Sequence, residues 1–302
     1  MKKLVLYFGL SLIFIGCQEE KSSAPFSIVC TTGMLADAVA NLLEGVDSVD
    51  IHALMGPGTD PHLYKASQSD VLALSRGDLI VYNGLHLEGK MQSLFEKLNQ
   101  DRVFAAAEQL PDSMLINASD YAQAHDPHVW FDLSLWSMVC QGLSQRLQEA
   151  LPQAAKIIAE NERNYQMDLE KAHSWALNKI ALIPEKQRVL VTAHDAFKYF
   201  GQAYKIEVRG LQGISTTAEF GLRDISDLAQ FIKDRGIKAV FVESSVSPKA
   251  IEAVREAVLR EGRNLKLGGE LYSDALGAAD SEAGTFLGMF YENVRTIESS
   301  LL

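Results

Sequence analysis

One uninterrupted helical stretch decides how this chain is organised: residues 152–183 are PQAAKIIAENERNYQMDLEKAHSWALNKIALI. Pro152 stands at its start, where a missing N–H costs nothing, and Pro184 follows its end. No glycine or further proline interrupts the stretch, which is rich in good helix formers. About 30 residues at 1.5 Å each span roughly 45 Å, enough to run the height of two lobes. We therefore predict a rigid spacer helix; two helices with a kink near Asn164 are the alternative.

On both sides of this stretch, short runs of strand character alternate with segments that have apolar residues at helical spacing. Before it, we predict strands at 26–32, 49–55, 78–83 and 102–107, and helices at 35–43, 67–74 and 87–98. After it, we predict strands at 188–192, 206–211, 239–243 and 266–271, and helices at 196–203, 222–235 and 248–261. Such alternation favours parallel sheets flanked by helices.

The predicted fold class is therefore α/β, with two lobes that contain parallel sheets and one long rigid α-helix between them. The predicted divisions are an N-terminal lobe at 26–150, a linking helix at 151–184 and a C-terminal lobe at 185–302.

The first 25 residues predict export and lipid anchoring. Two lysines precede an uncharged, mostly apolar run at 4–15, too short to span a bilayer but suited to a signal peptide. The run ends in a small residue before Cys17, and a polar stretch follows, which resembles a bacterial lipobox. We expect a lipoprotein signal peptide at 1–16, a diacylglyceryl group on the Cys17 thiol and a tether at 17–25. A plain cleaved signal is the alternative. The protein should then lie in the cell envelope, outside the cytoplasm.

The composition indicates a globular protein that does not bind nucleic acid. The 302 residues are 47% hydrophobic and 22% charged, as in soluble globular proteins. A formal net charge of −11 offers no basic stripe for phosphates, so we expect no nucleic-acid partner. Cys30 and Cys140 lie in apolar contexts and are expected as buried thiols, with a disulfide as the alternative. We expect a monomer.

The tripeptide Asp-Pro-His occurs twice, at 60–62 and at 126–128. Proline fixes its own φ and keeps the preceding residue out of the helical region, which stiffens the backbone around each histidine. A stiff backbone suits a preorganised ligand. His62 and His128 are therefore candidate metal ligands.

Two further candidates follow predicted strands in the second half. His194 follows the strand at 188–192, and Asp274 follows the strand at 266–271. The carboxyl ends of strands are where open α/β sheets place ligands. Imidazole nitrogens suit zinc, iron and manganese, and carboxylate oxygens suit harder ions. Each half thus offers two side chains that can bind one divalent ion.

Four motifs resemble those of one family. They are GTDPHLY at 58–64, DPHVWFD at 126–132, TAHDAFKYF at 192–200 and LYSDALG at 271–277. They are similar to the ligand motifs of the TroA-like manganese/zinc/iron solute-binding lipoproteins of ABC importers. The resemblance implies two α/β lobes joined by a long helix, and metal ligands at His62, His128, His194 and Asp274. It also implies capture of Mn²⁺, Zn²⁺ or Fe²⁺ as cargo and delivery to a membrane permease.

His194 leaves the identity of the metal open. In the family that this chain resembles, Glu at the position of His194 would favour manganese, whereas His is compatible with manganese, zinc and iron. Zinc-scavenging relatives often carry a histidine-rich loop before the second motif, and the stretch 110–124 has no histidine. A nitrogen-rich site would nevertheless bind zinc more tightly than manganese.

The remaining candidates are assigned lesser roles. We expect His86 and His125 to lie near the cleft between the two lobes, and Glu243 to face that cleft. Asp60 and Asp126 are expected to orient the imidazoles of the neighbouring histidines. His52 and His173 are expected to be structural. Because no His-Glu-x-x-His helix or nucleophile elbow is present and four protein ligands would fill the metal's shell, we expect no enzyme. The alternatives are a metal-stabilised surface adhesin and a metallohydrolase.

Overall fold

The computed structural model describes residues 24–118, 125–217 and 220–302. The predicted signal peptide at 1–16 and the predicted lipidation site Cys17 lie outside the described residues. Among the helices that are described, none combines the length and the apolar character needed to cross a bilayer.

The first half forms a four-stranded parallel sheet in the order β2-β1-β3-β4. The strands are β1 (Phe26–Cys30), β2 (Val49–Ala53), β3 (Leu79–Tyr82) and β4 (Val103–Ala105). The helices between them are α1 (Gly33–Leu42), α2 (Gln68–Arg76) and α3 (Gln92–Phe95). Cys30 lies beside Ala53 on one neighbour and Val81 on the other, so the strands end together at one edge.

The helix predicted at 87–98 is wrong in extent. The structure has only the four residues of α3 there, preceded by a tight turn. The carboxylate of Glu88 accepts hydrogen bonds from the backbone N–H groups of Asn83 (2.8 Å) and Gly84 (3.2 Å). These bonds hold the chain in the turn and delay the start of the helix.

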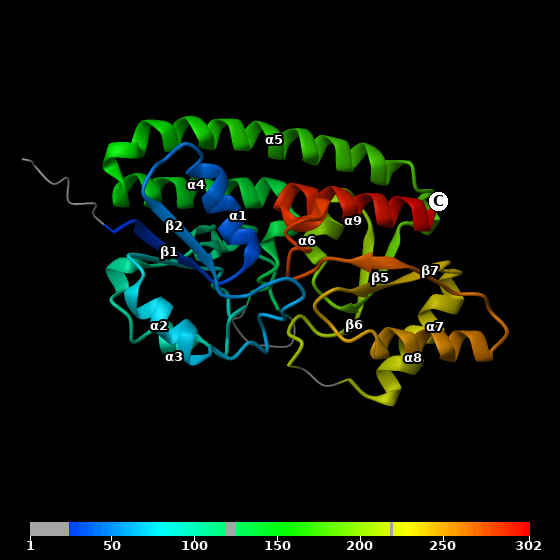
Figure 1. Ribbon diagram of the computed structural model, residues 1–302. Coiled ribbons are helices and arrows are strands. Elements are labelled where there is room, and N and C mark those ends of the chain that lie inside the picture. The colour runs from blue at the N-terminus through cyan, green and yellow to red at the C-terminus, as the bar shows by residue number, and fades with distance from the viewer. Residues whose placement is uncertain (1–23, 119–124, 218–219) are drawn as a thin grey trace, which may run out of the picture.

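The second half contains two parallel strand pairs, β5 with β6 and β7 with β8. The strands are β5 (Val189–His194), β6 (Glu207–Gln212), β7 (Ala239–Glu243) and β8 (Lys266–Leu271). Their helices are α6 (Lys198–Tyr204), α7 (Leu222–Arg235) and α8 (Lys249–Arg260). β5 lies beside β7, which brings the two pairs together (Figure 1). The predicted α/β class with parallel sheets is confirmed.

A layer of long helices covers both halves (Figure 1). It consists of α4 (Leu133–Ala150), α5 (Ala155–Ala181) and the C-terminal α9 (Phe286–Leu301). The predicted spacer helix is confirmed as a short 3-10 turn, Pro152–Ala154, that leads into α5. Asn164 lies inside α5, so the two-helix alternative is wrong. α5 packs on α4 and α1 of the first half and on α6 and α9 of the second.

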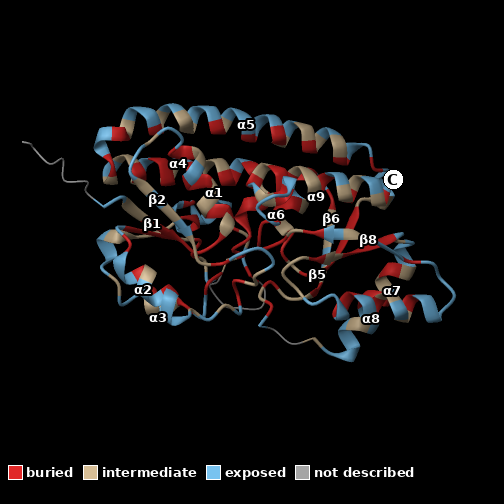
Figure 2. Ribbon diagram, viewed as in Figure 1, coloured by how far each residue is buried: buried red, intermediate tan, exposed pale blue. Residues whose placement is uncertain are grey.

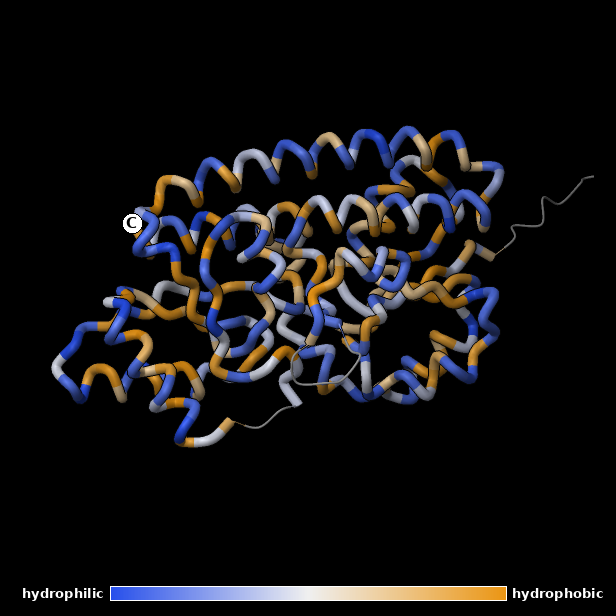
Figure 3. The backbone as a smooth tube through the Cα atoms, turned by 180° about the vertical axis from the view of Figure 1, so that it is seen from behind, coloured by the Kyte–Doolittle hydropathy of each residue, from blue (hydrophilic) through white to orange (hydrophobic). Residues whose placement is uncertain are grey.

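One face of α5 is apolar and points into the protein. Hydrophobic and hydrophilic residues are interleaved along its length (Figure 3). The buried residues recur at helical spacing and are Ile158, Tyr165, Leu169, Ala172, Ala176 and Ile180. This single stripe allows one helix to cover both halves.

The largest hydrophobic cluster includes residues of both halves, and buried segments run from one into the other (Figure 2). Phe131 stacks on Phe197 with ring centroids 4.3 Å apart, and Trp136 stacks on Phe286 at 5.0 Å. Such aromatic pairs contribute about 0.5–1.5 kcal/mol each beyond the burial of their area. The halves therefore share one core, which opposes any separation that would expose it.

Candidate metal centre

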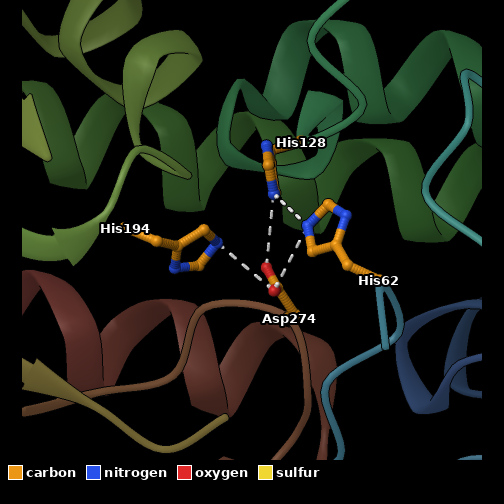
Figure 4. A group of neighbouring side chains, drawn as sticks. All are labelled: His62, His128, His194 and Asp274. Carbon is orange, nitrogen blue, oxygen red and sulfur yellow. Dashed lines mark hydrogen bonds and ion pairs between the residues drawn. The ribbon is translucent and has the colours of Figure 1, made fainter. Parts of the chain in front are cut away.

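The four side chains predicted as ligands converge between the two halves (Figure 4). His62 lies in the loop after β2, and His128 immediately precedes the 3-10 turn Val129–Phe131. His194 is the last residue of β5, and Asp274 lies three residues beyond β8. All four are buried, and one ligand atom from each lies within 4.8 Å of the others.

The distances between these ligand atoms match a tetrahedral metal site. The Nε2 atoms of His62 and His128 are 3.3 Å apart. The carboxylate oxygens of Asp274 lie 3.7, 3.5 and 3.3 Å from the Nε2 atoms of His62, His128 and His194 respectively. A tetrahedral ion bound at about 2.0–2.1 Å requires ligand atoms about 3.3 Å apart. These four distances are close to that value, and all four ligand atoms lie within 4.8 Å of one another.

Two carboxylates outside the cluster orient its imidazoles. Oδ1 of Asp126 lies 2.7 Å from Nδ1 of His128 and also accepts the backbone N–H of that residue at 3.0 Å. Oε2 of Glu243 lies 2.5 Å from Nδ1 of His194, and Oε1 accepts the backbone N–H of His194 at 2.8 Å. A carboxylate beside Nδ1 favours a proton on that nitrogen and directs Nε2 at the centre, where it can bind a metal once the ring is neutral. The expected role of Asp126 agrees with this geometry, whereas Glu243 is buried behind His194 and does not line the cavity beside His62.

Asp60 has a different role from the expected one. Its Oδ1 accepts the backbone N–H of His62 at 2.9 Å, and its Oδ2 accepts the hydroxyl of Thr216 at 2.7 Å. Asp60 therefore positions the backbone of His62 rather than its ring, and it links the two halves. In the same loop, Gly58 has a φ of +67°, and a Cβ there would lie 3.2 Å from the carbonyl oxygen of Ser244. Glycine suits both this backbone conformation and this close approach.

A second polar contact crosses between the halves next to the centre. The indole Nε1 of Trp130 donates to the carbonyl oxygen of Ser273 at 3.0 Å. Trp130 is two residues from His128, and Ser273 precedes Asp274. No feature of the sequence predicts this pairing, apart from the presence of an indole donor within a ligand motif.

Burial and charge shift the pKa values of the cluster in opposite directions. Burial lowers the pKa of His62 to about 3. Burial also opposes the charged form of His194, but the carboxylates of Glu243 and Asp274 outweigh it and raise its pKa well above the ordinary value. For Asp274, burial favours the neutral acid, yet the surrounding imidazoles lower the pKa of this carboxyl below its usual range.

Asp274 is therefore an ionised carboxylate in a site shielded from water. Neither of its oxygens accepts a hydrogen bond of good geometry from any residue that the structure describes. A buried charge of this kind is stable only beside a compensating cation. A proton on His194 supplies that charge without metal, and a dication would supply it with all three imidazoles neutral.

The other histidines fall into two groups. His86 and His125 line a cavity of about 430 Å³ that also reaches His62. His52 is exposed on β2, and His173 on α5 has its Nδ1 3.1 Å from the hydroxyl of Tyr204, so both lie away from the cluster. The two predicted buried thiols, Cys30 and Cys140, are free and buried, as expected.

The fold and the site define a two-lobed binding protein with a buried centre of three histidines and one aspartate. A family model described as "Zinc-uptake complex component A periplasmic" matches residues 28–300. The chain belongs to this family.

Curated relatives and solved structures agree with that assignment. The chain is 44% identical over 300 residues to "Manganese-binding lipoprotein MntA" of Bacillus subtilis, covering 98% of this chain and 97% of the relative. It is 45% identical over 287 residues to "Zinc-binding protein TroA" of Treponema pallidum, covering 95% and 92%. The solved structure of that periplasmic zinc-binding protein matches with a TM-score of 0.88 at 44% identity, covering 92% of this chain and 99% of that one.

The class of protein predicted from the four motifs is thereby confirmed. Another relative, 28% identical over 312 residues with 100% of this chain and 99% of the relative covered, is "Metal ABC transporter substrate-binding lipoprotein SloC" of Streptococcus mutans. The chain is a metal-binding solute receptor of the ABC-importer type.

Proposed function

We propose that this chain captures one divalent transition-metal ion between its halves and delivers it to the membrane permease of an ABC importer. The ligands would be His62, His128, His194 and Asp274. The observation that carries the proposal is the convergence of three imidazole Nε2 atoms on the buried carboxylate of Asp274, at 3.3–3.7 Å from its oxygens. Relatives of the chain are named for manganese and for zinc binding, which supports the same cargo class.

Mn²⁺ and Zn²⁺ are the proposed cargo. The two relatives named for these metals have similar identities to the chain, so overall similarity does not separate them. A site of three imidazoles and one carboxylate binds zinc more tightly than manganese, with ferrous iron between them in the usual affinity order. We therefore expect tighter zinc binding in solution, with the transported metal set by its availability.

Carriage of the metal accounts for the site better than catalysis. Four protein ligands fill a tetrahedral shell and leave no position for a reactive water. A carrier must also release its ion, and two hydrogen bonds between the halves lie beside this centre. One of these hydrogen bonds joins Thr216 to Asp60, and the other joins Trp130 to Ser273.

The remaining parts of the proposal concern location and assembly. A lipid group on Cys17 would hold a monomeric receptor at the outer face of the membrane. The described chain begins at residue 24, at one end of the long axis of the molecule (Figure 1). The permease would dock across both halves, where the cavity beside His62 opens.

The test is a matched pair of histidine variants. The full-length protein in detergent micelles is titrated with Zn²⁺ and Mn²⁺ against a competing chelator. His128→Ala should lose most of the affinity, whereas His173→Ala on α5 should keep it, and circular dichroism should show both folded. Unchanged affinity in His128→Ala would refute the proposed ligand set.

A further inference from the structure

The cavity beside the metal centre has a second set of imidazoles. It has a volume of about 430 Å³, and His62, His86 and His125 all line it. Only His62 belongs to the buried cluster. Residues from the other half close the far side and include Ile214, Ser215 and Thr217. The cavity is therefore the approach to His62 between the two halves.

His86 is held at the wall of this cavity by a strained turn. Three successive residues have left-handed backbone, with φ of +82° at Gly84, +52° at Leu85 and +63° at His86. For the two that carry a Cβ, this conformation costs roughly 1–2 kcal/mol each. Strain of this kind persists where surrounding contacts impose it, and it gathers at functional sites.

Two carboxylates behind the turn make the contacts that impose this left-handed backbone. Glu88 is buried and accepts from the backbone of Gly84 and from the hydroxyl of Thr31 at 2.6 Å. Glu108 accepts the backbone N–H of Leu85 at 3.2 Å. The imidazole of His86, in contrast, is exposed on the cavity side. These hydrogen bonds hold the turn in place and so position the His86 ring at the cavity wall.

His125 lies on the same cavity with an unsatisfied nitrogen. Its Nδ1 is shielded from solvent and has no hydrogen-bond partner among the described residues. Its backbone is fixed by an antiparallel bridge to Asn117. A shielded polar atom without a partner costs about 1–3 kcal/mol.

We propose that His86 and His125 form a transient capture site, where an incoming hydrated divalent transition metal binds before it passes to His62 and the buried cluster. Two imidazoles with water in the other positions give a weak site that releases the ion readily. Replacing the waters in steps avoids stripping the whole hydration shell of a dication at once. His62 lines the cavity and belongs to the cluster, so it is the ligand that receives the ion.

Lys90 also lines the cavity and opposes a cation there. Its side chain is exposed, so the ammonium group can extend into water, where its repulsion is screened. This inference rests on the proposed metal centre as the destination of the ion.

The test compares rates with affinities in the full-length protein. Binding of Zn²⁺ is followed by stopped flow with a fluorescent chelator, and the equilibrium affinity is measured by competition. His86→Ala and the double variant His86→Ala/His125→Ala should slow association, the double variant by about tenfold, and slow dissociation by the same factor. The affinity should be unchanged, because the site lies on the path and not in the final complex.

The matched control removes two histidines elsewhere, as His52→Ala/His173→Ala, and should bind at the wild-type rate. Wild-type association in both His86 variants would overturn the capture site. A lower affinity with faster dissociation would overturn it too, since His86 would then hold the bound ion. Failure of the metal centre itself is distinguishable, because it appears as unchanged affinity in His128→Ala.

Discussion

The carboxylate of Glu243 holds His194 with both of its oxygens, one 2.5 Å from the ring Nδ1 and the other 2.8 Å from the backbone nitrogen. Asp126 makes the matching pair of contacts to His128 with a single oxygen. Each half of the molecule thus supplies one imidazole whose direction is set by a carboxylate behind it. Both Nε2 atoms face the centre before any ion arrives, which lowers the cost of ordering the ligands.

Removing the charge of Glu243 should therefore weaken metal binding without removing a ligand. Glu243→Gln keeps the size of the side chain but orients the ring and its tautomer less firmly. We expect an affinity loss of about 10- to 100-fold for Zn²⁺ in a competition titration. Glu270→Gln, an exposed neighbour on β8, is the matched control and should bind as the wild type does. Equal affinities for the two variants would contradict the orienting role.

The raised pKa of His194 predicts that a proton leaves when metal binds. Its ordinary value is 6.5 and the folded, metal-free value is well above that, so the imidazole is charged at pH 7. Because only a neutral imidazole binds metal, affinity should fall as the pH is lowered below this raised pKa. Calorimetry at pH 7 in buffers of different ionisation enthalpy should show about one proton released per ion. A binding enthalpy that is the same in every buffer would count against this assignment.

The same shift fixes the sign of a stability effect in the metal-free protein. A histidine whose pKa is higher folded than unfolded stabilises the fold below the unfolded value, and this contribution is lost as the pH rises through the folded value. Asp274 acts in the opposite way, since its pKa is lowered from 3.8 and its contribution is lost in acid. His62 opposes this trend, because burial lowers its pKa to about 3, and it destabilises the metal-free fold as the pH falls below its ordinary value of 6.5.

Local chemistry explains why much of this site could be predicted from the sequence. His62 and His128 stand in a repeated, proline-stiffened tripeptide, and His194 and Asp274 follow strands whose carboxyl ends meet at the ligand edge. The contacts of Thr216 and Trp130 left no such signal. Each joins residues more than 140 positions apart, and packing of the two halves alone brings them together.

The two long helices α4 and α9 are missing from the prediction made from the sequence. Their sequences mix apolar residues with glycine and β-branched residues, and neither helix is among those that we predict from the sequence. A local signal for α4 does exist, because the side chain of Asp132 accepts the backbone N–H of Ser134 as an N-terminal cap. The buried residues of α4 also recur at helical spacing, as at Trp136, Val139 and Leu143, so its pattern could have been recognised in the sequence.

The shared core predicts that metal removal leaves the two halves in place. Hinge opening would break the Phe131–Phe197 and Trp136–Phe286 stacks and expose apolar surface along α5. The radius of gyration from small-angle scattering should therefore agree, within error, between the chelated and the Zn²⁺-loaded protein. A clear expansion on chelation would show that the halves separate and that α5 is not a rigid spacer.

Release must then depend on local contacts, and the hydrogen bond from Thr216 to Asp60 is the one beside His62. Thr216→Val keeps the shape of the side chain but leaves Oδ2 of Asp60 without this donor. Burial already raises the pKa of Asp60, and the hydroxyl of Thr216 offsets part of that rise. The loop of His62 should loosen, and Zn²⁺ dissociation should accelerate by about tenfold, which corresponds to about 1.4 kcal/mol. Thr217→Val is the matched control, because its hydroxyl contacts Ser215 within its own half and lies 2.8 Å from it. If stopped-flow dissociation into excess chelator is equally slow for both variants, the contact between the halves does not retain the ion, and His62 would be held by its own loop alone.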